Sequence, residues 1–313
     1  MAAHPAVASQ EISTNDRAQP LALHLVRLWF RGLSAVAPRL AERHAARLFF
    51  SPRRRPRRPA VRLAGAPGDA FTVRAGGDRV ACWSWGRGPA VLFVHGWDGT
   101  SHDWEAMAAE VLAAGYRVVL FDLPAHGSSR GRTTALPDIV RVMHAIAHEL
   151  APSPGGRFEP LEAVVGHSFG GAAAALALRD GLLARRAVLI APVADPPAWV
   201  HHVAEMFGLD RARTAGMMEH VRRRAGGDLS RVDVVRAAGE IGIPALIVHD
   251  PRDRAVPYEG GRALARAWRG ARFVRADGLG HRGILRDPEL VAAVAGFVGG
   301  ADAGPNQVRA AAA

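Results

Sequence analysis

Lysine is absent from this chain, and cysteine occurs once, at Cys82. A single cysteine excludes an intramolecular disulfide and any metal centre built from several thiolates. All 40 basic residues are therefore arginine, and the formal net charge is +11. Such a charge ordinarily favours an acidic partner such as nucleic acid or anionic lipid. Because the arginine accompanies abundant alanine, we interpret most of the charge as compositional bias and expect no nucleic-acid partner.

Long apolar runs are also missing. The best candidate, LALHLVRLWFRGLSAVA, is interrupted by His24, Arg27 and Arg31, whereas a membrane span needs about 18 or more consecutive apolar residues. Residues 1–20 lack the basic start and apolar core of a secretory signal. These absences lead us to expect a cytoplasmic protein, either soluble or associated with a membrane at its surface. The sequence gives no indication of the oligomeric state.

Composition divides the chain into four stretches. Residues 1–20 and 299–313 are small or polar, and we expect both to be disordered. Residues 21–69 are expected to form an amphipathic helical extension followed by the linker SPRRRPRRPA, whose prolines oppose helix and strand. Residues 70–298 are expected to form the main domain, because strand and helix patterns begin there.

The helical extension carries apolar residues at helical spacing. Two amphipathic helices are predicted, with a break near Pro38. Two alternatives for these helices stay open: they pack against the sheet domain, or residues 21–58 contact an anionic membrane. The apolar residues that define the predicted face are Leu21, Leu25, Leu28, Trp29, Val36 and Leu40.

The main domain begins with a predicted hairpin around AGGD and then alternates apolar strands with helical segments. Strands that are apolar on both faces predict a buried, mostly parallel sheet with helices on either side, an α/β fold. Ligands bind such sheets at the carboxyl ends of the strands. Residues 193–240 lack a strand pattern and are predicted to form an inserted helical cap. The predicted strands after the hairpin are AVLFVH, RVVLFD, LEAVVG, AVLIAP, ALIVHD and ARFVRA.

The stretch VVGHSFGG places Ser168 where a strand pattern changes to a helix pattern. A serine hydroxyl becomes a useful nucleophile when a tight turn lifts it clear of its neighbours and a base lies beside it. Gly166 and Gly170 provide the missing side chains that such a turn requires. The small alanines that follow predict a closely packed helix whose N-terminal dipole favours developing negative charge. We therefore predict that Ser168 is a nucleophile and not an ordinary turn residue.

This Gly-x-Ser-x-Gly turn and its surrounding strands resemble the nucleophile elbow of the α/β-hydrolase fold over about residues 71–298. The resemblance implies a serine hydrolase in which an acid and then a histidine follow the serine. Asp253 in PRDRAVP matches the acid that stands four residues before a proline, and Asp250 at the strand end is its rival. His281 in DGLGHRG occupies the position of the base.

The resemblance also implies an oxyanion hole. Gly96 follows an apolar strand as in the family's first turn, so the backbone N–H groups of Trp97 and Phe169 are the implied donors. The Trp97 side chain has two alternative roles, lining a pocket or simply packing beneath the cap. Asp122 and His126 in FDLPAHGSS resemble a family loop that is usually structural, so no direct chemistry is expected of them.

The predicted function is hydrolysis of a carboxylic ester, or a related acyl bond, of a small, apolar substrate through an acyl-enzyme on Ser168. Thioesterase, acyltransferase and carbon–carbon bond hydrolase activities use the same triad and stay open. A receptor-like hydrolase that binds a ligand and turns over slowly is an alternative of another class. The cap residues that favour an apolar pocket are Trp199, Met206, Phe207, Met217 and Met218.

Neither a cofactor nor a metal is predicted. The cap histidines His201, His202 and His220 do not fall into a metal-ligand pattern with nearby carboxylates. Asp287 is predicted to cap the last helix. The only partner that the sequence specifies is therefore a small-molecule acyl substrate.

Overall fold

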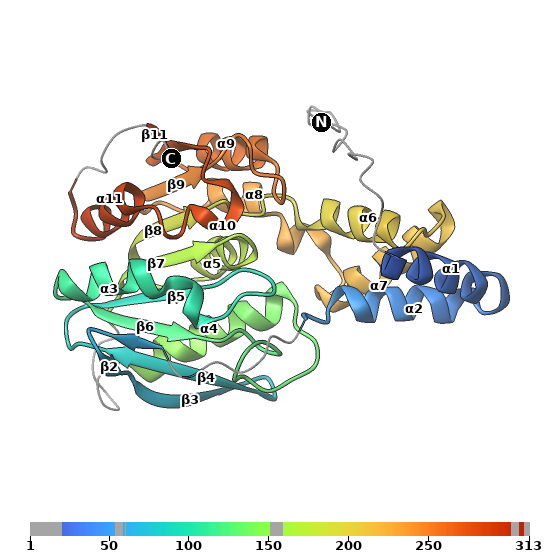
Figure 1. Ribbon diagram of the computed structural model, residues 1–313, viewed down its shortest axis with the longest axis horizontal. Coiled ribbons are helices and arrows are strands. Elements are labelled where there is room, and N and C mark those ends of the chain that lie inside the picture. The colour runs from blue at the N-terminus through green and yellow to red at the C-terminus, as the bar shows by residue number, and fades with distance from the viewer. Residues whose placement is uncertain (1–20, 54–58, 60, 151–158, 302–306, 310–313) are drawn as a thin grey trace.

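The computed structural model describes residues 21–53, 59, 61–150, 159–301 and 307–309. These residues form a sheet domain with a group of helices beside it (Figure 1). Three of the predicted segments fall mainly outside the described residues. These are residues 1–20, the linker residues 54–58 and most of residues 299–313, so the disorder expected of the two ends of the chain stays a prediction.

In the described part of the chain, nine strands form one sheet in the order β11-β10-β9-β8-β7-β5-β6-β4-β3. From β6 through β11 neighbouring strands are parallel. At the other edge, β4 is antiparallel to β6 and forms the predicted hairpin with β3. The strands are β3 (Asp69–Ala75), β4 (Asp78–Trp85), β5 (Ala90–Val94), β6 (Arg117–Phe121), β7 (Leu161–His167), β8 (Ala184–Ile190), β9 (Ala245–His249), β10 (Ala271–Asp277) and β11 (Gln307–Arg309). A separate antiparallel pair is formed by β1 (Arg62–Leu63) and β2 (Ala66–Pro67).

The parallel strands are buried on both faces, as their apolar sequences predict. In β5, Val91 and Phe93 join the apolar core on one side of the sheet, whereas Leu92 and Val94 join the core on the other side. Fully burying such a side chain contributes about 1.5–3 kcal/mol. The predicted α/β architecture is therefore confirmed.

Helices cover both faces of the sheet (Figure 1). One face is covered by α3 (Glu105–Ala113) and α11 (Pro288–Val298), which contact each other. The first residue of α11 follows Asp287, whose carboxylate accepts the Leu290 N–H at 3.0 Å, so the predicted cap is confirmed. The other face is covered by α4 (Leu136–Leu150), α5 (Phe169–Arg179), α8 (Val234–Gly239) and α9 (Tyr258–Ala267).

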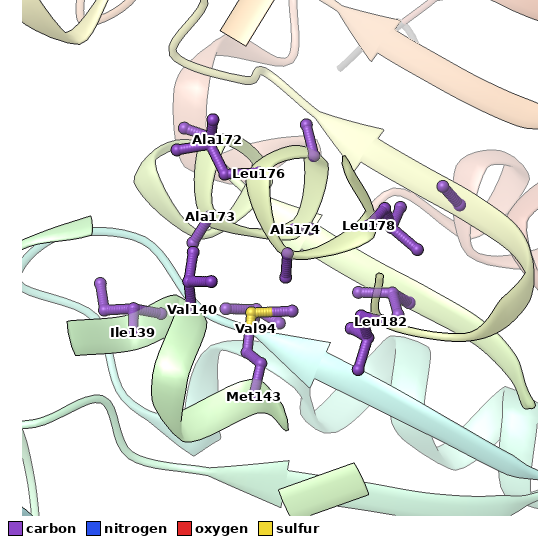
Figure 2. Close-up of a cluster of buried hydrophobic side chains, with 14 of the residues drawn as sticks. Val94, Ile139, Val140, Met143, Ala172, Ala173, Ala174, Leu176, Leu178 and Leu182 are labelled. Carbon is purple, nitrogen blue, oxygen red and sulfur yellow. The ribbon is translucent and has the colours of Figure 1, made fainter. Parts of the chain in front are cut away.

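Small side chains let α5 lie close to the sheet and to α4. Figure 2 places Ala173 and Ala174 of α5 above Val94 of β5 and Met143 of α4 in one cluster. The alanines of this helix are fully buried. Because larger side chains would push α5 outward, the composition of the helix fixes the position of its N-terminus, where the candidate nucleophile lies.

The cap and the N-terminal extension form one helical unit beside the sheet domain (Figure 1). Its four helices share an apolar cluster, in which Phe30 stacks on Phe207 with ring centroids 4.8 Å apart. The carboxylate of Glu42 lies 3.1 Å from the Arg213 guanidinium. The extension therefore packs against the protein, as one alternative supposed, but it does so on the cap and not on the sheet. The helices are α1 (Leu21–Val36), α2 (Pro38–Phe49), α6 (Pro196–Met206) and α7 (Arg211–Arg224).

A buried carboxylate connects this helical unit to the sheet domain. Asp138 near the start of α4 accepts the Ala135 N–H at 3.0 Å and receives the Arg224 guanidinium, whose Nη1 lies 3.0 Å from its Oδ1. Arg224 is the last residue of α7, so the end of the cap is held where α4 begins. Within the described residues, none of the helices combines the length and the apolarity that spanning a membrane requires.

Candidate active site

Ser168 lies in the turn between β7 and α5. Its backbone has φ 54° and ψ −119°, a left-handed conformation that is strained for a residue with a side chain. The turn is held in place because the Ser168 N–H donates to the Ile190 carbonyl at 2.9 Å. The residue is 7% exposed. The structure therefore has the sharp strand-to-helix turn that the sequence predicts.

The glycines around Ser168 are required by close approaches of the backbone. A β-carbon on Gly166 would lie 2.7 Å from the Gly170 carbonyl oxygen, and one on Gly170 would collide with the Val94 carbonyl. A β-carbon on Gly96 would lie 3.0 Å from that of Ser168. The loop after β5 therefore runs directly beside the candidate nucleophile.

Asp253 and His281 form a hydrogen-bonded pair. Asp253 lies in the loop after β9, and His281 lies in α10 (Gly280–Gly283) after β10. His281 Nδ1 donates to Asp253 Oδ2 at 2.7 Å, which leaves Nε2 as the ring nitrogen that can accept a proton. The Asp253 side chain is fully buried, whereas the His281 side chain is 17% exposed. The structure thus brings together two residues that lie far apart in the sequence and that the family resemblance pairs.

The surroundings of Asp253 favour its ionised form. Burial alone would raise the pKa of Asp253, but hydrogen bonds from His249 and His281 and the charge of His281 lower this pKa below its usual range. His249 Nε2 lies 3.4 Å from Asp253 Oδ2, and the backbone N–H groups of Ala255 and Val256 donate to Asp253 Oδ1 at 2.7 and 3.0 Å. A carboxylate in this state can orient His281 and stabilise its charged form.

Asp250, the rival acid, has different partners. Its Oδ1 accepts the Arg252 N–H at 2.7 Å, and its Oδ2 accepts the Gly280 N–H at 2.5 Å. Arg252 precedes Asp253, and Gly280 precedes His281. Asp250 is fully buried, and it therefore holds the loop of the candidate acid against the loop of the candidate base. Sequence reasoning missed this role, since it depends on the neighbouring positions of β9 and β10.

His167 connects the turn of Ser168 to His281 and was also missed from the sequence. Its Nε2–H donates to the His281 carbonyl at 2.8 Å, and the two ring centroids lie 4.6 Å apart. Burial, and then the charge of His281, lower the pKa of His167 to about 3, so the ring is neutral near pH 7. Its position directly before Ser168 is the one sequence feature that could have indicated this role.

We expect the protein to lose stability below pH 6.5 in part because of His167. Its pKa falls from 6.5 to about 3 on folding, so the folded state binds fewer protons in this interval and stability decreases as the pH decreases. Between pH 6.5 and about pH 5 this group alone accounts for about 2 kcal/mol. His167→Gln keeps an N–H donor but does not titrate, so urea unfolding should give it a flatter stability profile. Parallel profiles for both proteins would contradict this expectation.

The two implied oxyanion donors lie in adjoining segments. Phe169 is the first residue of α5, so no carbonyl of that helix can accept a hydrogen bond from its backbone N–H. Trp97 follows Gly96, which contacts the turn of Ser168. The rings of Trp97 and Phe169 meet edge to face, with centroids 5.2 Å apart. The Trp97 ring therefore packs against the residue that follows the candidate nucleophile.

The polar residues Asp122 and His126 bind backbone groups, as a structural role requires. Asp122 accepts the N–H groups of Ser101 and Ser128 at 2.8 and 2.7 Å. His126 Nε2 accepts the Asp98 N–H at 3.2 Å. These bonds hold the loop that contains Trp97 and Asp98, so both residues support the candidate site from outside.

The prediction that cap residues line an apolar pocket is wrong for Phe207 and Met217. Phe207 stacks on Phe30, and Met217 is fully buried in the same cluster between the cap and the N-terminal helices. The sequence correctly places these apolar side chains in the helical cap, but it does not show that the N-terminal extension covers them. Trp199 instead packs against the core of the sheet domain.

Several known proteins resemble this chain in sequence or in fold. Residues 91–294 match a family model described as the alpha/beta hydrolase family. A pimeloyl-[acyl-carrier protein] methyl ester esterase of Xanthomonas campestris pv. campestris is 29% identical over 247 residues, which cover 66% of this chain and 93% of that protein. Est1E of Butyrivibrio proteoclasticus, solved with ferulic acid bound, has a TM-score of 0.59 at 20% identity over 73% of this chain and 96% of its own. An esterase of Exiguobacterium antarcticum has a TM-score of 0.56 at 17% identity over 74% and 100%.

Proposed function

Because this chain belongs to the alpha/beta hydrolase family, we propose that it is a serine esterase that cleaves a carboxylic ester of a small, apolar acyl substrate. The observation that carries the proposal is the Asp253–His281 pair, joined at 2.7 Å. The hydrogen bond from His167 to the His281 carbonyl supports it, because it ties this pair to the turn of Ser168. Ser168, His281 and Asp253 are the proposed nucleophile, base and acid.

In the proposed mechanism, His281 Nε2 takes the proton of Ser168 Oγ as this oxygen attacks the ester carbonyl carbon. The resulting oxyanion is stabilised by the N–H groups of Trp97 and Phe169, and each such donor is worth about 3 kcal/mol. The His281 imidazolium, oriented by Asp253, then gives its proton to the departing alcohol. An acyl-enzyme remains on Ser168.

Water completes the cycle by the same steps. His281 takes a proton from the water as its oxygen attacks the acyl carbon, and the second tetrahedral intermediate uses the same two N–H donors. Collapse of this intermediate returns the proton to Ser168 Oγ and releases the carboxylic acid. The full cycle consumes one ester and one water molecule, releases one alcohol and one carboxylic acid, and returns Ser168 and His281 to their starting protonation states.

The substrate class is proposed on two grounds. The ring of Trp97 packs edge to face on the ring of Phe169, the residue directly after the candidate nucleophile, which favours an acyl group that is apolar next to its carbonyl. The relative from Xanthomonas campestris pv. campestris is named for a methyl ester, so methyl esters belong in the substrate panel. A small leaving alcohol fits a serine that is 7% exposed.

The proposal is tested by initial rates with p-nitrophenyl esters from acetate to palmitate, together with methyl esters and thioesters of the same acids. We expect multiple turnovers on oxygen esters, with kcat/KM highest at the chain length that fits the site. Turnover of thioesters alone would point to a thioesterase, and turnover only with an added alcohol would point to an acyltransferase. A single burst without further turnover would favour the receptor-like alternative.

A further inference from the structure

The helix α1 has apolar side chains on two opposite faces. One face, formed by Val26, Phe30 and Leu33, packs against the cap. The opposite face, which we call the outer face, points to solvent, although it contains most of the large apolar residues of the helix. The outer face consists of Leu21, Leu25, Leu28, Trp29 and Val36, which are 77%, 58%, 62%, 47% and 87% exposed.

Three leucines of the outer face form a row, so the exposed apolar residues are not a scatter of single side chains. Leu21, Leu25 and Leu28 follow one another at helical spacing, so they lie in one row. Among the described residues, all but one of the exposed large apolar side chains lie on α1 and α2, and the exception is Leu183. A contiguous apolar patch on the surface of a protein marks a contact surface.

The charge of the neighbouring helix α2, whose His44 ring lies 4.9 Å from the ring of Trp29, selects the partner of the outer face. The helix α1 contains no acidic residue, and α2 presents Arg39, Arg43 and Arg47 on its exposed side, one helical turn apart. The only acid of α2, Glu42, is paired with Arg213. A second copy docked symmetrically on this surface would bring arginines together, which is unfavourable. An anionic lipid surface instead offers phosphates to the arginines and hydrocarbon to the leucines.

We propose that the outer face of α1, with the arginine row of α2, docks the protein on an anionic membrane. The helix lies in the plane of the interface with Leu21, Leu25, Leu28 and Val36 in the acyl boundary. The inner face of α1 stays on the cap, so docking requires no rearrangement of the Phe30 cluster. This proposal does not depend on the reaction that Ser168 performs.

The test is vesicle co-sedimentation of the full chain, with pure phosphatidylcholine compared with an equal mixture of phosphatidylcholine and phosphatidylglycerol. Wild type should bind the anionic vesicles at least about a hundredfold more tightly, since each arginine near the surface contributes about 1 kcal/mol. A Leu25→Glu, Leu28→Glu double variant should lose that binding. Leu183→Glu introduces the same change at an exposed leucine of the sheet domain (55% exposed) and should bind like wild type. Thermal unfolding verifies that each variant is folded.

A third variant, Arg39→Gln, Arg43→Gln, Arg47→Gln, tests the charge without changing the apolar face. We expect its affinity for anionic vesicles to fall about a hundredfold, towards the value for neutral vesicles. The proposal is overturned if wild type ignores anionic vesicles, or if the Leu25→Glu, Leu28→Glu variant binds like Leu183→Glu. It is also overturned if sedimentation shows a dimer that this double variant abolishes and that does not bind vesicles.

Discussion

Replacing Ser168 with alanine is expected to lower kcat for ester hydrolysis by at least about four orders of magnitude. The variant loses the oxygen that, in the proposed mechanism, attacks the acyl carbon, and alanine offers no atom that can replace it. Alanine keeps the β-carbon, so Gly96 and Gly166 keep their packing around the turn. The free energy of unfolding, measured by thermal unfolding, should therefore stay within about 1 kcal/mol of the wild-type value. The initial rates on the best p-nitrophenyl ester should fall to background.

A second substitution, Ser168→Gly, distinguishes the loss of the nucleophile from the relief of backbone strain at this position. Ser168→Gly should be as inactive as Ser168→Ala, but its positive φ of 54° is accessible to glycine without strain, so it should be at least as stable as the alanine variant. A fluorophosphonate should label wild type at Ser168, as peptide mass spectrometry can establish, and neither variant at that position. Residual turnover above about one per cent in Ser168→Ala would rule out the proposed nucleophile.

The architecture could be predicted because local patterns specify it. Strands that are apolar on both faces, such as β5, have one stable environment, between two helical layers. The glycines near Ser168 were also predictable, since the turn forces backbone segments together at Gly166 and Gly170. In each case the physical constraint acts within a few residues, so the sequence carries it directly.

The contacts that Asp250 and His167 make with Gly280 and His281 could not be predicted, because these partners follow a different strand, β10. Asp250 reaches Gly280 only because β9 and β10 are neighbours, and His167 reaches His281 because β7 ends at the same edge of the sheet. A sequence specifies which side chains are polar and buried, but not which backbone N–H or carbonyl a fold brings to them.

The N-terminal helices illustrate a different limit. Periodicity predicted α1 and α2, but the apolar row that it selected, from Leu21 through Leu28, is exposed, whereas Phe30 on the opposite side is fully buried. When a helix is apolar on two faces, the pattern does not state which face meets the protein. The contacts with the cap, such as that of Phe30 with Phe207, decide that question.

The two carboxylates near His281 lead to the second large expected effect. Asp253→Asn should lower kcat by about three to four orders of magnitude, because an amide can donate to the ring and favour the wrong tautomer of His281. The substitution also replaces an ion whose pKa is held below its usual range by His249 and His281, against the effect of burial. The loss should appear mainly in kcat, since Asp253 does not touch the substrate in the proposed mechanism.

Asp250→Asn is the matched control, since it removes the same charge at a buried carboxylate three residues away. One amide oxygen can still accept an N–H, so one of the bonds to Arg252 and Gly280 survives. We expect a loss of about 1–3 kcal/mol in stability but less than about a hundredfold in kcat, because the Asp253–His281 bond remains. If Asp250→Asn reduces kcat as much as Asp253→Asn while both variants unfold like wild type, then Asp250 supplies the catalytic charge, and the acid must be reassigned to the end of β9.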